Sequence, residues 1–443
     1  MDNHLFDDLD DEPAALTVSR LIAMYQSPQP DIDEVFLAGM TDIHWADLMH
    51  AHGAATDVPP LLRALLSHDP DHRDFALKLL FETIWHQGTV YQASAYAVPL
   101  LTRLLVHPET PNKPGIIYLL ASLADGHSYL AVHERTEADI ADARERLARH
   151  GLDFETELHK ELGWVQQSRA AVLAGVPTFL QLLDDDDREV QAFARYILSL
   201  LPEAASASIP RLVDRMPNDD DTLRGHTLLA LDALLPIAPS AVDVFEHAYD
   251  HERNPTLRTL AALALLKRQG TSAPAAIVET LIQASQVLDT NPDYRYDAWM
   301  VDARFYPAPW GLDRAEDIAG AFAACDSATG AQHFLAALAG VRNNDVAHIF
   351  VARLLDLVFH GQRAEVRGAT YSMRDGRDVI EYRIRQPIPP RQRTTLDPNQ
   401  EAALTAIVQH TLFWTTDTNL LELYGLPSTR GSLQEWLFQS RSG

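Results

Sequence analysis

A Val-Pro or Ile-Pro pair recurs along this chain of 443 residues at nearly regular distances. The intervals between successive pairs are 40, 78 and 33 residues, and 78 is about twice 39. A repeat of this length is typical of helical hairpins that stack in a row, each burying its apolar side only against its neighbours. The four pairs are Val58-Pro59, Val98-Pro99, Val176-Pro177 and Ile209-Pro210.

The clearest repeat runs from Val176 to Glu203. Pro177 suits the first turn of a helix, where its missing N–H is not needed. The acidic run Asp184–Asp187 is followed by apolar residues at helical spacing from Val190 to Leu201. Carboxylates at the start of that second helix would cap it and match its dipole. We therefore expect each Val/Ile-Pro pair to open one helix, and each Asp- or Asn-rich turn to begin another.

These features resemble HEAT-type helical repeats. The matching elements are the proline near the start of the first helix, the Asp/Asn turn, and the Leu-Arg pairs Leu223-Arg224 and Leu257-Arg258 in the second helix. Two further stretches are similar to parts of uncharacterised bacterial HEAT-repeat proteins: Trp85–Tyr91, and the C-terminal Phe413-Trp414, Asn419–Leu421 and Tyr424–Pro427. The resemblance implies an all-α fold, an α-solenoid of HEAT-like hairpins, and it implies no reaction.

The pattern divides the chain into seven parts. We expect an acidic tail and capping helices at 1–57, repeats at 58–126, an irregular helical insertion at 127–175, repeats at 176–290, an aromatic connector with further helices at 291–362, an Arg-rich β-hairpin with a Pro-rich linker at 363–393, and a helical cap at 394–443.

The β-hairpin is predicted by strict alternation. Ile380, Tyr382 and Ile384 fall on one face of a strand from Val379 to Arg385, and Asp375-Gly376 separates it from a second β-compatible run. Eight arginines stand against four acidic residues between 363 and 393. This local excess favours docking to an acidic surface, either the protein's own concave face or a partner. The candidate contacts are Arg367, Arg377, Arg383 and Arg385.

Two other surfaces are candidates for partner binding. An aromatic stretch interrupted by prolines fits either a recognition groove or a buried connector; its members are Tyr294, Tyr296, Trp299 and Trp310. The acidic turns, stacked one repeat apart, predict an acidic ridge that fits a basic partner; its members are Asp185, Asp186, Asp219 and Asp220.

Composition narrows the function. The chain has 36 basic and 62 acidic residues, a net charge of −26, which disfavours nucleic-acid binding. The chain has a single cysteine, Cys325, which excludes an intramolecular disulfide. We interpret Cys325 as a small core residue. The start of the chain lacks an apolar signal segment, and no run of 18 uncharged apolar residues occurs. We expect a cytoplasmic protein that does not enter membranes.

No catalytic motif is present. His44, His50 and His52 lie close in sequence but lack the spacing of a metal site, and we interpret them as scattered surface histidines. We therefore expect no metal, no cofactor and no enzymatic activity. The leading hypothesis is a scaffold or adaptor that binds a protein partner. The alternatives are an immunity or antitoxin protein that neutralises a basic toxin, a HEAT-like DNA glycosylase, and a chromophore lyase of light-harvesting antennae.

Overall fold

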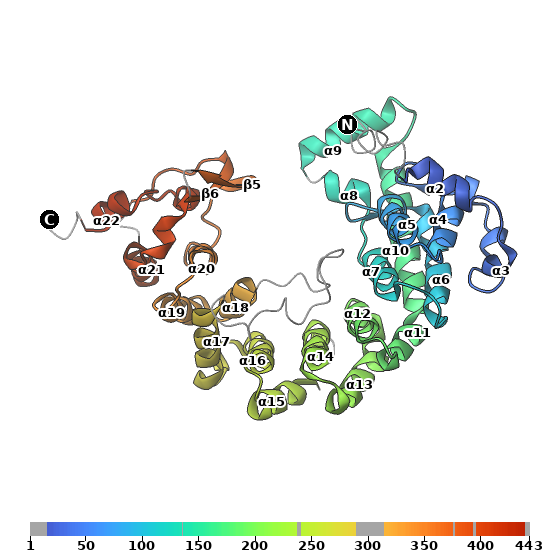
Figure 1. Cartoon of the computed structure of the whole chain (residues 1–443). Coiled ribbons are helices and arrows are strands. Elements are labelled where there is room, and N and C mark those ends of the chain that lie inside the picture. The colour runs from blue at the N-terminus through green and yellow to red at the C-terminus, as the bar shows by residue number, and fades with distance from the viewer. Residues whose placement is uncertain are drawn as a thin grey trace. The chain divides into compact units, whose positions relative to one another are not determined.

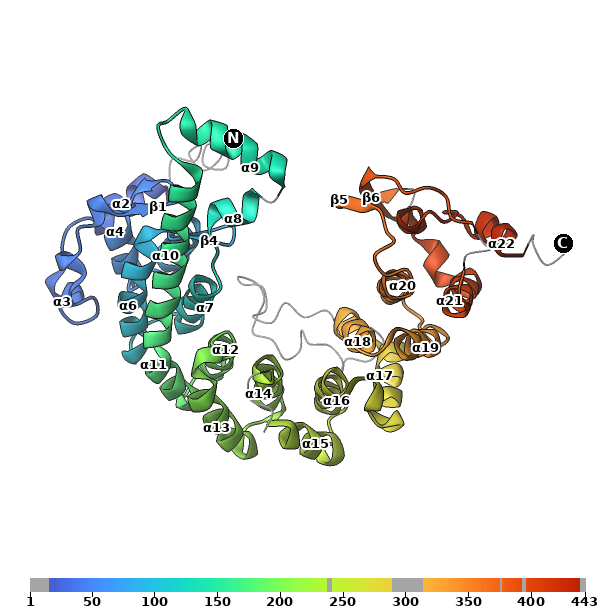
Figure 2. The same cartoon turned by 180° about the vertical axis from the view of Figure 1, so that it is seen from behind.

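The computed structural model describes residues 16–134, 136–236, 241–288, 314–374, 377–392 and 396–438. These residues are mostly helical, with short antiparallel β-hairpins and one three-stranded sheet (Figures 1 and 2). The chain divides into two compact units, Met1–Ala238 (unit 1) and Pro239–Gly443 (unit 2). A mostly helical chain with a β-hairpin near the C-terminus is therefore confirmed. The four candidate aromatic residues between 294 and 310 lie outside the described residues.

Unit 1 contains four helix pairs (Figure 1). The second helices also contact one another in series, since α12 packs against both α7 and α14. The pairs are α4 (Val58–Ala64) with α5 (Pro70–Thr83), α6 (Gln92–Val106) with α7 (Lys113–Ala124), α11 (Val176–Gln181) with α12 (Arg188–Ser199), and α13 (Ala205–Arg215) with α14 (Asp221–Leu234).

The remaining elements of unit 1 precede or interrupt these pairs. The long helix α10 (Phe154–Ala174) packs against α6 and α7, between the second and third pairs in sequence. Its neighbours α8 and α9 close a small separate apolar cluster around Ala143. These elements are α2 (Val18–Tyr25), α3 (Pro30–Asp33), β1 (Met49–His50), β2 (Gly53–Ala54), β3 (Trp85–His86), β4 (Thr89–Val90), α8 (Tyr129–His133) and α9 (Glu137–Ala148).

The expected caps begin the second helices. Asp69 accepts the backbone N–H of Asp71 at the start of α5, and Asp220 accepts that of Leu223 at the start of α14. Asn112 and Asp187 cap α7 and α12 in the same way. Each cap satisfies a backbone donor that has no partner inside the helix.

The prediction that every Val/Ile-Pro pair opens a helix is wrong for two of the four pairs. Pro59 and Pro177 lie in the first turns of α4 and α11, but Pro99 and Pro210 lie inside α6 and α13. The helix α6 begins earlier because Ser94 Oγ accepts the backbone N–H of Tyr91 at 2.8 Å and caps its start. A proline inside a helix removes one backbone hydrogen bond, which packing must offset.

Unit 2 has two rows of helices. One row is formed by α16, α18 and α20, which contact each other in that order, and the other by α17, α19 and α21. The elements are α15 (Val242–His251), α16 (Pro255–Gln269), α17 (Ala275–Val287), α18 (Arg314–Ala323), α19 (Ser327–Leu338), α20 (Asn344–Val358), α21 (Pro398–Gln409) and α22 (Arg430–Phe438), with 3-10 turns η11 (Leu412–Thr415) and η12 (Leu420–Tyr424).

The predicted hairpin is present in unit 2. Strands β5 (Glu365–Arg374) and β6 (Arg377–Gln386) pair antiparallel on either side of Asp375-Gly376, and β7 (Asp417–Thr418) adds a short parallel strand to β6. The strand order is β5-β6-β7, so β5 is an edge strand. The sequence did not predict β7 or the two short hairpins of unit 1.

One buried histidine holds the sheet against α20. His348 Nε2 lies 3.0 Å from the Tyr382 hydroxyl, and its ring stacks on the rings of Tyr382 and Phe413. Burial lowers the pKa of His348 to about 4. The neutral imidazole therefore joins a helix, a strand and the C-terminal segment.

This histidine predicts a pH dependence for the stability of unit 2. The unfolded chain binds a proton at His348 near pH 6.5, whereas the folded chain does so only near pH 4. Stability is therefore unaffected above pH 6.5 and falls as the pH drops from 6.5 towards 4, by ~3 kcal/mol for this group.

Urea unfolding of the wild type and of His348→Phe at pH 7.5 and at pH 4.5 measures this contribution. We expect the variant, which keeps the ring stack, to lose much less stability on acidification. Equal losses in both proteins would contradict the assignment to His348.

Candidate functional site

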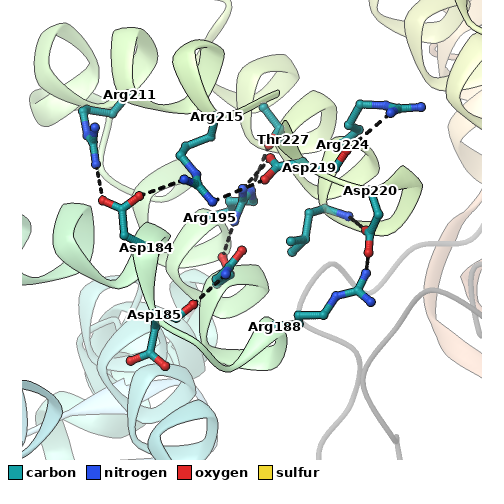
Figure 3. Close-up of polar contacts among 12 residues, drawn as sticks. Asp184, Asp185, Arg188, Arg195, Arg211, Arg215, Asp219, Asp220, Arg224 and Thr227 are labelled. Carbon is teal, nitrogen blue, oxygen red and sulfur yellow. Dashed lines mark hydrogen bonds and ion pairs between the residues drawn. The ribbon is translucent and has the colours of Figure 1, made fainter. Parts of the chain in front are cut away.

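The acidic turns of unit 1 already carry ion pairs within the chain (Figure 3). Asp184 contacts Arg211 at 2.6 Å and Arg215 at 3.1 Å, so the third helix pair is linked to the fourth. Further pairs join Asp185 to Lys113 at 3.1 Å, Asp220 to Arg188, and Asp221 to Arg224 at 2.7 Å.

The central pair of this network is fully buried. Arg195 Nη2 lies 2.6 Å from Asp219 Oδ2, and the two side chains are 0% and 1% exposed. Arg195 also donates to Thr227 Oγ1 at 2.9 Å and to the Gln191 carbonyl at 2.9 Å. Burial lowers the pKa of the Arg195 guanidinium, and the Asp219 carboxylate opposes that shift. The pair therefore connects α12 to the start of α14.

These contacts change the physical meaning of the predicted ridge. Asp185, Asp219 and Asp220 each face a cation of the same chain, so their charge is largely compensated locally. Asp186 is exposed and forms no ion pair with a described residue. Binding of a basic partner by these four residues stays a prediction, but three of them also hold helix pairs together.

Some arginines of the hairpin segment contact other groups of the chain, and others are exposed. Arg363 pairs with Asp356, and Arg391 lies over the Phe359 ring and donates to the Tyr424 carbonyl. Arg385 pairs with Glu365 across the hairpin. Arg374 and Arg383 are exposed and form no ion pair with the described part of the chain. Arg367 and Arg377 lie on β5 and β6, and their side chains are not described.

His50 and His52, two of the three candidate histidines, lie close together. His86, which the sequence analysis did not single out, lies beside His52. His50 is buried, and its Nε2 lies 2.8 Å from Asp57 Oδ1 while its Nδ1 accepts the backbone N–H of His52. Both ring nitrogens of His50 are thus engaged. The His52 and His86 rings lie 5.4 Å apart, whereas His44 is exposed at the start of a 3-10 turn.

Residues of this group line a small pocket of about 200 Å³. Its polar lining comes from His52, Asp57, Glu82 and Thr83, over an apolar base that includes Leu61. No set of three or more His, Cys, Asp or Glu residues in the described ranges is placed to hold a metal ion. The interpretation of these histidines as surface residues is wrong for His50, because the short hairpin β1–β2 folds it inward against Asp57.

Four aromatic rings line up along the second helices of unit 1; we call them the aromatic strip. They are Phe81 on α5, Trp85 on β3, Tyr118 on α7 and Tyr196 on α12. The Phe81 centroid lies 5.8 Å from that of Trp85 and 5.6 Å from that of Tyr118, and Tyr118 and Tyr196 stack at 6.3 Å. All four are half-buried, so each ring presents part of its surface.

The hairpin β3–β4 places Trp85 at one end of the strip. Gln87 and Gly88 both have positive φ, at 49° and 90°, which a two-residue turn between right-twisted strands requires. The backbone of Val90 is in turn held by the carbonyl of His127 at 3.0 Å. At the other end of the strip, burial raises the pKa of Tyr196 to about 12, and the nearby Tyr118 and Asp125 act in the same direction.

Sequence reasoning missed the aromatic strip, although a signal for it exists. Tyr118 and Tyr196 are 78 residues apart, and each follows a Val-Pro pair by 20 residues. The same repeat position therefore carries tyrosine twice. Comparing equivalent positions across repeats, rather than only their apolar spacing, would have found the pair.

Cys325 is buried, which confirms its interpretation as a core residue. Burial also raises the pKa of its thiol. Within the described ranges, no helix is long and apolar enough to cross a membrane.

Comparison with known proteins gives no family. No protein-family profile and no curated protein matches the chain. Matching solved structures include an engineered protein determined by the Northeast Structural Genomics Consortium. It is 18% identical, with a TM-score of 0.27, and the alignment covers 77% of this chain and 88% of that one. A likeness at this level carries no functional conclusion.

The buried pair predicts a large stability difference between neighbouring acidic residues. Asp219→Ala leaves the Arg195 guanidinium buried without its counter-charge, so we expect a loss of about 3–5 kcal/mol in the free energy of unfolding of unit 1. Asp186→Ala, in the acidic turn before α12 but exposed and in no ion pair with a described residue, is the matched control and should change stability by no more than about 0.5 kcal/mol.

Urea denaturation followed by circular dichroism measures both variants. A loss below about 1 kcal/mol for Asp219→Ala would show that unit 1 does not depend on this pair.

Proposed function

We propose that this protein is a non-catalytic scaffold that binds a protein partner, and that the partner lies across the aromatic strip. The architecture we propose for it is an α-solenoid of HEAT-like hairpins. The observation that carries the proposal is the continuous line of four half-buried rings from Trp85 to Tyr196. We place it in the cytoplasm.

The solenoid is supported by the order of contacts and by the caps. In unit 1 the second helices touch in series, and in unit 2 two rows of helices form. The second helices of successive pairs start on an Asp or Asn side chain that accepts backbone N–H groups, and α16 in unit 2 starts the same way on Asn254. A repeat array is expected to carry the same structural feature at the same position of each repeat, and here that feature is the Asp or Asn cap at the start of the second helix.

Partner binding is supported by the chemistry of the aromatic strip. Tyrosine and tryptophan offer a large contact area with few rotatable bonds, and they are enriched among the residues that dominate binding energy. Aromatic faces also attract Lys and Arg side chains. The exposed Asp125 beside Tyr196 adds a carboxylate, and the chain as a whole carries −26 charges. A basic segment of a protein partner therefore fits this surface best.

The acidic ridge fits a basic partner less well. Its carboxylates are compensated by arginines and Lys113 of the same chain. A partner that used them would have to displace ion pairs that already hold helix pairs together.

Substitution of the two stacked tyrosines tests the proposal. We expect Tyr118→Ala with Tyr196→Ala to weaken capture of the partner from extract of the native organism by at least about thirtyfold, since the loss of even one central aromatic contact costs about 2 kcal/mol. The matched control is Tyr96→Ala with Tyr129→Ala, two tyrosines that are 42% and 43% exposed outside the strip. Binding is measured by affinity purification and quantitative mass spectrometry.

Thermal unfolding of both double variants accompanies the test, so that a folding defect is recognised. The proposal fails if a partner is retained equally by the strip variant and by wild type, or if wild type captures none.

A further inference from the structure

The long strand β5 presents an open hydrogen-bonding edge. It lies at the end of the strand order β5-β6-β7, and seven of its described residues are exposed, with Val366 half-buried. Met373 is 75% exposed. None of its backbone groups bonds to another described element outside the sheet.

The register shows which backbone groups point to that edge. The N–H of Tyr382 donates to Asn419 Oδ1 at 2.8 Å, and its carbonyl accepts from Asn419 Nδ2 at 3.0 Å, so both groups point away from β5. Tyr382 stands opposite Ala369. In an antiparallel pair, the backbone N–H and C=O groups of two directly opposed residues either point towards each other or point away from each other. The N–H and C=O of Ala369 therefore point outward, as do those of Tyr371 and Met373 by alternation.

The outward groups lie on a straight segment of suitable length. From Ala369 to Arg374 the pairing with β6 is regular, and a bulge separates this segment from Val366. Three outward residues supply three donors and three acceptors, enough to pair with an added strand of about six residues. We propose that this edge binds an extended acidic peptide segment, which adds a strand to β5.

Charge selects the acidic peptide over a second copy of the chain. Antiparallel pairing of β5 with β5 of another copy that satisfies all three outward residues places Arg374 of each copy opposite Gly368 of the other, at the bulge. The bulge interrupts the ladder there, and no carboxylate of the second copy stands opposite Arg374. Carboxylates on alternate residues of an incoming strand would instead lie beside Arg374, which is exposed and in no ion pair with a described residue. The same face carries the exposed Arg383 and Glu381 on β6, one strand further away.

A defined set of peptides tests the inference. The probe is a fluorescein-labelled peptide of four Thr-Glu repeats, titrated with the full-length protein and followed by fluorescence anisotropy. Four Pro-Glu repeats carry the same charge but no backbone N–H at alternate positions, and four Thr-Lys repeats reverse the charge. We expect saturable binding of the Thr-Glu peptide and at least about tenfold weaker binding of the other two.

Two pairs of variants locate the site. Met373→Pro removes an outward N–H and leaves the bonds to β6 intact, because proline is tolerated on the open side of an edge strand; Met373→Ala keeps the N–H. We expect at least about tenfold weaker binding for the proline variant and a change within about twofold for the alanine variant. Arg374→Ser with Arg383→Ser should weaken binding about fivefold, whereas Arg353→Ser, an exposed arginine of α20, should not.

The outcomes distinguish strand addition at β5 from simple attraction of anions. Equal binding of the Thr-Glu and Pro-Glu peptides, or wild-type binding by Met373→Pro, would mean that the arginines merely attract anions, and would overturn the inference. Absence of saturable binding, or equal binding of the Thr-Lys peptide, would also overturn it. The variant Tyr118→Ala with Tyr196→Ala should bind the Thr-Glu peptide normally, so this site and the aromatic strip can fail independently. Thermal unfolding checks that each variant is folded.

Discussion

The caps at the starts of the second helices are the constraint on which the rest of unit 1 depends. A short helix in water is marginal, so its position is set by what satisfies its first backbone N–H groups and by what its apolar side packs against. Asp187 and Asp220 fix where α12 and α14 begin. Those starting points place Arg195 opposite Asp219 and Tyr196 beside Tyr118. A cap shifted by one residue would rotate both contacts about 100° around the helix.

The sequence predicted what depends on neighbours in the chain. The hairpin β5–β6 followed from alternation and from Asp375-Gly376, and the caps followed from the Asp/Asn turns. The start of α6 was misplaced for a local reason, because Tyr91 and Ser94 cap the helix before Pro99. Other predictions failed where groups distant in the chain decide. The acidic turns were recognised, but not the arginines that fold onto them, since Arg195 and Asp219 are 24 residues apart. The aromatic strip was missed for the same reason.

Net charge alone is therefore a poor guide to which surface binds. The value of −26 describes the long-range field, which attracts basic molecules from a distance. Contact energy depends on charges that are not already paired. Where Asp219 is buried against Arg195, its charge is committed to holding two helices together. Under the proposed function, a basic partner attracted by the field would gain most from the aromatic faces of the strip.

The edge of β5 needs a physical account even without a ligand, because long open edges invite pairing between copies of a protein. Two features oppose that here: the bulge next to Gly368, which interrupts the ladder, and the exposed charge of Arg374 at the edge. Neither feature prevents a strand of opposite charge from pairing with the segment from Ala369 to Arg374. A helix or loop laid over the edge would have prevented both kinds of pairing. Charge prevents only one, and it leaves the outward N–H and C=O groups accessible to an acidic strand.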